Sequence, residues 1–201
     1  MGLLSGSVSF VRYAIEGDPP QNFWDFTAEQ VAKFSFKDID DSYEERSVGW
    51  VSTFNMFDSE FTEAAYSAGD YIVLSLRIDE RKVSLAALKK FCLKEEERIK
   101  KERRVPRLNK AVRQEIKENV RLMLVKKAVP IPSVYDLCWN FSKGTLLFFS
   151  TGRKAQEVLE NFFKETFGLR IVLQIPYLAA AHLLDDQNRK TLSDIGPSIF
   201  V

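Results

Sequence analysis

Positive charge is concentrated in one part of this 201-residue chain, between Arg81 and Lys127. That segment carries 17 lysines and arginines against 6 glutamates, a net charge of +11. The rest of the chain carries 12 basic and 22 acidic residues, so the formal charge of the whole molecule is only +1. Segregation of charge on this scale is the electrostatic footprint expected of a protein that binds a polyanion.

The composition predicts a folded protein with a substantial core. Hydrophobic residues make up 45% of the chain and include 16 phenylalanines and 3 tryptophans, which argues against disorder. Cys92 and Cys138 lie in apolar contexts and are expected to be reduced, buried thiols. The start of the chain lacks a signal-peptide pattern, and no apolar stretch approaches the roughly 20 residues of a membrane span. We therefore expect a cytoplasmic protein.

Hydrophobic periodicity predicts an α+β fold with mostly antiparallel sheets, because strands and helices are segregated more than they alternate. The predicted strands are residues 7–14, 49–51, 71–77, 134–141, 145–150 and 171–175. The predicted helices outside the basic segment are residues 22–34, 153–167 and 177–184, the second ending at Gly168. Residues 38–45 are expected to form an acidic loop, and the last 15 residues a loose tail.

The basic segment itself is predicted to form a helical hairpin. Ser84 is the expected cap of a first helix that reaches about Arg104, and Asn109 that of a second helix that reaches about Lys127. Pro106 separates the two, and Pro130 and Pro132 stop the second. The predicted apolar faces are Leu85, Leu88, Phe91, Cys92 and Ile99 on the first helix and Val112, Ile116, Val120, Met123 and Leu124 on the second.

This pattern divides the chain into three parts. Residues 1–80 form an N-terminal α+β part, residues 81–130 the basic hairpin, and residues 131–201 a part with a strand hairpin, a helix and a further strand. The alternative is that residues 81–130 are an insertion within a single domain.

The cations of the hairpin favour an anionic ligand. Arg113, Lys117 and Arg121 stand at i, i+4 and i+8, where like charges repel unless an anion neutralises them. On the first helix, Glu96 and Glu97 are spaced to pair with Lys100 and Lys101, whereas seven other cations have no acid at the right spacing: Lys89, Lys90, Lys94, Arg98, Arg103, Arg104 and Arg107. The predicted DNA-binding residues are these seven together with Lys82, Lys110, Arg113, Lys117, Arg121, Lys126 and Lys127.

Other roles for this basic surface stay open at this point. The lysines could simply form a solvated face, or the surface could bind an acidic protein or a membrane. A membrane helix would carry large apolar residues opposite its cations, and Phe91 and Leu93 supply little. The segment also lacks interleaved aromatics for stacking unpaired bases. Contact with the backbone of a duplex, without reading of its bases, fits best.

No catalytic site is predicted, and neither a metal nor a cofactor. The only dense acidic cluster, Asp38, Asp40, Asp41, Glu44 and Glu45, has the contiguous setting of a solvated turn rather than of converging metal ligands. His182, the sole histidine, is expected to be a half-buried helix residue, and Trp50 and Trp139 to belong to the core. Neither a glycine-rich phosphate loop nor a nucleophile motif is present.

An ordered set of short motifs resembles the family of the bacterial recombination-associated protein RdgC. The set comprises Gly49-Trp50-Val51, Arg77, Arg81-Lys82-Val83, residues 103–107, Lys110, Arg113, residues 115–118, Trp139, and residues 151–157 opening a helix that ends in Phe167-Gly168-Leu169. The resemblance covers roughly residues 7–184. It implies an α+β protein that binds DNA with little sequence preference, works as a ring-shaped homodimer with a basic inner surface and restrains RecA-driven recombination.

The chain also departs from the family pattern. Typical members continue into a further C-terminal domain, and the sequence ending at Val201 is expected to function without it. The family has a basic-Ala-Phe element after the second helix, whose Phe reaches into the partner subunit, and here Lys127-Ala128-Val129 occupies that place. Because Val129 is too short to act as the same anchor, only the DNA-contact role is carried over, to the hairpin cations.

Together these observations predict a non-enzymatic, sequence-nonspecific DNA-binding homodimer that is associated with the nucleoid and limits the access of RecA to DNA. The alternatives are a metal-dependent exonuclease, a label that some family members carry, and a module that binds an acidic protein partner. The preference for single- or double-stranded DNA and the closure of a ring are left open.

Overall fold

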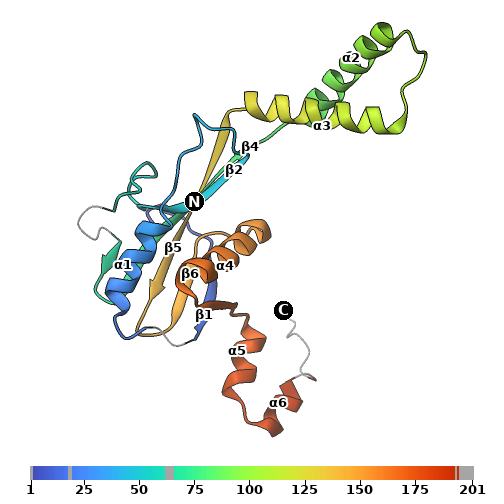
Figure 1. Ribbon diagram of the computed structural model, residues 1–201. Helices are drawn as coiled ribbons and strands as arrows, with labels where there is room; N and C mark the ends of the chain where they lie inside the picture. Colours follow the sequence, from blue (N-terminus) through green and yellow to red (C-terminus); the bar gives the residue numbers. More distant parts are fainter. Residues whose placement is uncertain (1, 18–19, 62–65, 193, 195–201) are drawn as a thin grey trace.

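The computed structural model describes residues 2–17, 20–61, 66–192 and 194, apart from the side chains of residues 178, 179, 182 and 186. Its strands form one sheet in the order β2-β4-β5-β6-β1-β7, with β3 also paired to β4, and all of these pairings are antiparallel. The predicted α+β class is confirmed (Figure 1).

Seven strands and the helices between them follow one another along the described chain. The strands are β1 (Val11–Glu16), β2 (Arg46–Val51), β3 (Ser67–Ala68), β4 (Tyr71–Arg81), β5 (Pro130–Asn140), β6 (Thr145–Phe148) and β7 (Arg170–Leu173). The helices are α1 (Phe23–Lys33), α2 (Leu85–Arg103), α3 (Lys110–Lys127), α4 (Arg153–Phe167), α5 (Pro176–Leu183) and α6 (Asp186–Leu192). As predicted, Gly168 ends α4 in the left-handed conformation, with φ of 70°.

Two predictions about the ends of the chain need correction. The first strand is displaced toward the C-terminus from the predicted 7–14, because its pairing partners in β6 and β7 face residues 11–16. The predicted tail begins with a helix, α6, whose start is capped by Asp185: the Asn188 N–H donates to its carboxylate at 2.9 Å. The remainder of that tail, 193 and 195–201, lies outside the described residues.

The main core lies between one face of the sheet and the helices α1 and α4. Trp50 and Trp139 are fully buried there, as predicted, and the Trp50 indole N–H donates to the Thr166 hydroxyl at 3.1 Å. Ile72, Leu74, Leu76 and Ile78, at every second position of β4, are buried in this core, which is the period expected of a strand with one face toward helices. Phe23 and Val31 of α1 and Leu159, Phe162, Phe163 and Phe167 of α4 complete this core.

Part of the opposite sheet face is covered by loops and hides a charged pair. The Arg77 guanidinium donates to both carboxylate oxygens of Asp79, at 2.9 and 2.7 Å, and both side chains are buried. It also donates to the Met56 carbonyl and lies 4.1 Å from the centre of the Phe36 ring. The bidentate geometry and the extra partners offset the cost of burying two charges.

The strands β4 and β5 connect the sheet to the basic hairpin. They pair over their whole length, from Tyr71 opposite Asn140 to Arg81 opposite Pro130. The hairpin of α2 and α3 leaves the sheet after Arg81 and returns at Pro130, and it projects away from the body (Figure 1). Pro130 and Pro132 thus open a strand directly after the helix ends. The division of the chain into domains stays a prediction.

Candidate nucleic-acid interface

Local sequence signals fix both ends of the hairpin helices. The Ala87 N–H donates to the Ser84 hydroxyl at 3.1 Å, and the Val112 N–H donates to the Asn109 side chain at 2.9 Å. Both predicted caps are confirmed, because each satisfies a backbone donor that the first helical turn leaves free. Arg104 ends α2 in the left-handed conformation, with φ of 53°.

The hairpin has a small apolar core of its own. Leu108, Ile116 and Val120 are buried in it, and the partly buried residues packed against them are Leu88, Phe91, Cys92, Ile99, Val105, Val112 and Leu124. Two predicted members differ: Leu85, in the first turn of α2, is 83% exposed, and Met123 is 37% exposed. Both line grooves on the hairpin surface instead of its interior. The small core holds the two helices side by side.

All fourteen cations predicted to contact DNA are exposed. Ten of them form no ion pair within the described part of the chain: Lys89, Lys90, Lys94, Arg103, Arg104, Arg107, Lys110, Lys117, Lys126 and Lys127. The remaining four are Lys82, Arg98, Arg113 and Arg121, each beside a carboxylate. Most of the positive charge on the hairpin therefore faces solvent without a counter-ion from the described residues.

The prediction that Arg98 has no acidic neighbour is wrong. Its guanidinium contacts Glu95 at 2.6 Å and Glu102 at 3.0 Å, three and four residues away on the same helix face. Lys100 pairs with Glu97 at 2.9 Å, rather than with Glu96 as the i, i+4 spacing suggested. Hydrogen bonds from these cations lower the pKa of Glu95 and of Glu97. Glu96 is then left to face the other helix.

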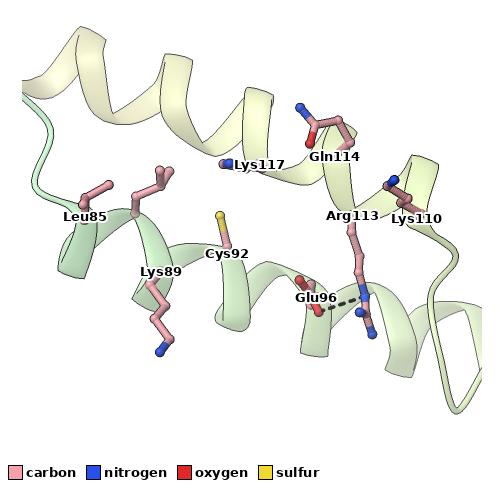
Figure 2. A pocket seen from close by; sticks show the side chains of 9 residues that line it. Leu85, Lys89, Cys92, Glu96, Lys110, Arg113, Gln114 and Lys117 are labelled. Carbon is pink, nitrogen blue, oxygen red and sulfur yellow. Dashed lines mark ion pairs between the residues drawn. The ribbon is translucent and has the colours of Figure 1, made fainter.

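One side of the hairpin gathers cations from both helices around a groove. Lys89 comes from α2, and Lys110, Arg113 and Lys117 come from α3 (Figure 2). Glu96 is the one acid that lines this groove of about 400 Å³, and its carboxylate lies 3.7 Å from Arg113. Cys92 lies at its floor, where burial raises the pKa of the thiol. The spacing of residues within α3 predicts that its cations share one face, but it cannot predict that Lys89 of α2 lines the same groove.

The opposite side of the hairpin carries a larger and less positive groove. It measures about 690 Å³, and its charged lining residues are Lys94, Arg98, Lys101 and Lys127 together with Glu95 and Glu97. Four cations line each groove, but two glutamates line this one and only Glu96 lines the groove of Figure 2, so the net positive charge of this lining is smaller. The two grooves single out the side with Lys89 and Lys117 as the stronger site for an anion.

The acidic loop 38–45 holds the base of the hairpin. Arg81 donates to the backbone carbonyls of this loop and to that of Ala128, just after α3. Glu45 pairs with Arg121 at 2.7 Å, and the Lys126 ammonium lies 4.7 Å from the centre of the Tyr43 ring. Sequence reasoning predicted a solvated turn here, whereas its carbonyls and one carboxylate bind the basic segment.

Two further candidates from the sequence were a metal-binding acidic cluster and His182. Within residues 2–17, 20–61, 66–192 and 194, no group of three or more histidines, cysteines or acids is placed to hold a metal ion. His182 lies in α5, but its side chain is outside the described part. No described helix is long and apolar enough to cross a membrane.

The fold and the surface define an α+β protein with a projecting, cationic helical hairpin. A family model described as "Putative exonuclease, RdgC" matches residues 13–183, which is most of the sequence. The chain belongs to the RdgC family. A comparison with curated proteins found no match.

Proposed function

We propose that this RdgC-type protein binds double-stranded DNA without sequence preference, through contacts between the hairpin cations and backbone phosphates. The observation that carries the proposal is the set of ten exposed lysines and arginines of the hairpin that form no ion pair with any described residue. Phosphates are the partners that resolve the repulsion among them, and such contacts carry affinity but no sequence information.

The groove shown in Figure 2 is the expected centre of contact. Lys89, Lys110 and Lys117 are exposed there without a carboxylate partner among the described residues, and Arg113 extends across the groove to Glu96 of α2. The hairpin projects from the sheet, so a long polymer can lie along it without meeting the body of the protein (Figure 1). Occupation of the duplex by this protein, as a homodimer, would limit the assembly of RecA on the same DNA.

Charge reversal tests the proposal. The triple variant Lys89→Glu, Lys110→Glu, Lys117→Glu removes three contacts. If about eight cations meet phosphates, the slope of log K against log salt is near −7 for the wild type, and the variant should reduce its magnitude by about 3. The matched control is Lys33→Glu, Lys154→Glu, Lys164→Glu, which changes the net charge equally at exposed sites on the body. Equal salt slopes for the two triple variants would refute the assignment.

The family description names an exonuclease, and this activity is the second candidate. Most nucleases bring two or three carboxylates together around divalent ions. Incubation of the pure protein with end-labelled DNA and Mg²⁺ or Mn²⁺ tests it. Sustained metal-dependent degradation that copurifies with the protein would support the exonuclease, and intact DNA under conditions of full binding would support the binding role. Weak DNA binding at physiological salt would instead favour an acidic protein partner.

A further inference from the structure

We infer that the open face of the sheet is a second nucleic-acid site, which binds a single strand by stacking its bases. The described helices leave this face uncovered where β1, β6, β5 and the start of β4 meet. A shallow hollow of about 320 Å³ lies there, near the lower end of the range for small-molecule sites. Its lining residues are Phe10, Arg12, Tyr71, Cys138, Asn140, Lys143, Thr145 and Leu147.

Two exposed aromatic rings border the hollow. Phe10, directly before β1, is 49% exposed, and Tyr71, the first residue of β4, is 44% exposed. The Phe10 ring is held from one side by the buried Phe149, at 5.9 Å between centroids. Aromatic rings displayed on an open sheet are a common platform for unpaired bases, because every base offers a π face.

Positive charge lies beside these rings without a competing acid. Arg12 and Lys143 both line the hollow, which has no acidic lining residue, and neither forms an ion pair within the described chain. Asp136, the nearest acid along the same face of β5, is already engaged: the Ser75 hydroxyl and the Leu3 N–H donate to its two oxygens. The hollow therefore combines stacking surfaces with cations for a phosphate.

Strand register explains how residues far apart in sequence come together here. Tyr71 pairs with Asn140, Asn140 with Thr145, and Thr145 with Ala14, two residues after Arg12 on the same face. The Lys143 N–H donates to the Asn140 side chain at 2.8 Å, which fixes the turn that presents the lysine. The lining residues thus belong to β1, β4, β5 and β6, with Phe10 just before β1 and Lys143 in the turn between β5 and β6.

This site is separate from the hairpin and selects a different ligand. Tyr71 and the hairpin are at opposite ends of β4, roughly 30 Å apart for a strand of this length. Bases in a duplex stack on one another and leave no ring face free, so an aromatic platform selects unpaired strands. The inference thus goes beyond the proposed duplex binding and does not require it.

Binding of a fluorescein-labelled oligothymidine tests the inference. We expect Phe10→Ala, Tyr71→Ala to weaken this binding by about thirtyfold or more, because two stacking contacts are lost, and to leave duplex binding unchanged. Phe10→Leu, Tyr71→Leu should lose a similar factor, since it keeps apolar bulk but no ring. Phe54→Ala, at an aromatic residue 76% exposed outside the hollow, is the matched control.

A second readout separates this site from the hairpin. A 2-aminopurine placed in the oligonucleotide should change its fluorescence on stacking with the wild type and with the hairpin variant Lys89→Glu, Lys110→Glu, Lys117→Glu. It should not do so with the aromatic double variants. The inference is overturned if the double variants bind the single strand like the wild type, if Phe54→Ala weakens it equally, or if the hairpin variant abolishes the stacking signal. If the hairpin variant loses duplex binding but keeps the stacking signal, that result concerns only the proposed function of the hairpin.

Discussion

The carboxylate of Glu45 lies 2.7 Å from the guanidinium of Arg121, across 76 residues of sequence. The ion pair joins the acidic loop 38–45 to α3, so one cation of the hairpin is occupied by the protein's own carboxylate. A phosphate that approaches Arg121 has to compete with Glu45 for the same guanidinium.

Removal of this competitor should strengthen duplex binding. Glu45→Gln frees Arg121, and because an exposed ion pair contributes about 0.2–1 kcal/mol, we expect affinity at low salt to rise about two- to fivefold. Fluorescence anisotropy with a labelled duplex measures the change. Glu44→Gln removes the same charge one residue away, from a side chain that pairs with no described cation, and should give a smaller rise. Equal rises would show that only the overall charge of the loop matters.

The buried pair of Arg77 and Asp79 should be sensitive to loss of one partner. Asp79→Asn leaves the buried Arg77 guanidinium with only the exposed Asp38 carboxylate, 4.0 Å away, as a counter-charge, and we expect the free energy of unfolding to fall by about 3–5 kcal/mol. Urea denaturation measures it. Glu80→Gln, whose carboxylate forms only exposed pairs with Arg46 and Lys82, should cost less than about 1 kcal/mol. Similar losses for both variants would contradict the importance of burial.

Stability at alkaline pH should depend on Tyr13. Burial, aided by the nearby Glu160 carboxylate, raises the pKa of Tyr13 above the ordinary tyrosine value of about 10. Above about pH 10 the phenol of Tyr13 loses its proton in the unfolded chain but keeps it in the folded protein, so the free energy of unfolding falls as pH rises.

Tyr13→Phe should therefore make the decline in stability shallower, by up to about 1.4 kcal/mol per pH unit above pH 10. Urea denaturation between pH 9 and 11 measures the slope, and Tyr177→Phe, at a half-exposed residue, serves as the comparison. An unchanged slope in Tyr13→Phe would mean that the phenol ionises in the folded protein as readily as in the unfolded chain.

Local signals predicted most of the hairpin. The side chains of Ser84 and Asn109 act within one helical turn, so their capping roles could be inferred from neighbouring residues alone. The failures at Leu85 and Arg98 have the same origin. For Leu85, the spacing of apolar residues identifies the face of the helix but not how far along that face the partner helix extends. For Arg98, several acids lie within one helical turn, so side-chain geometry decides which of them forms the ion pair.

Contacts between distant segments could not be predicted from periodicity. The engagement of Arg81 by the loop carbonyls and the pair of Glu45 with Arg121 depend on where β4 ends beside the loop 38–45. That Arg12 and Tyr71 line the same hollow depends on the order of β1, β6, β5 and β4 in the sheet. The predicted first strand starts at residue 7 because apolar and polar residues alternate from there, whereas hydrogen-bonded pairing with other strands starts only at Val11. Phe10 therefore lies just before β1 and not within it.

The pairing of Arg81 with Pro130 has a consequence for how members of such a family can diverge in size. The chain leaves the sheet and rejoins it at adjacent positions, so the register of β4 and β5 is independent of what lies between them. One extra turn in each of α2 and α3 would lengthen the projection by about 5.4 Å while every residue of the body kept its neighbours. The span of polymer covered by one molecule can thus be adjusted by insertion or deletion without rebuilding the scaffold.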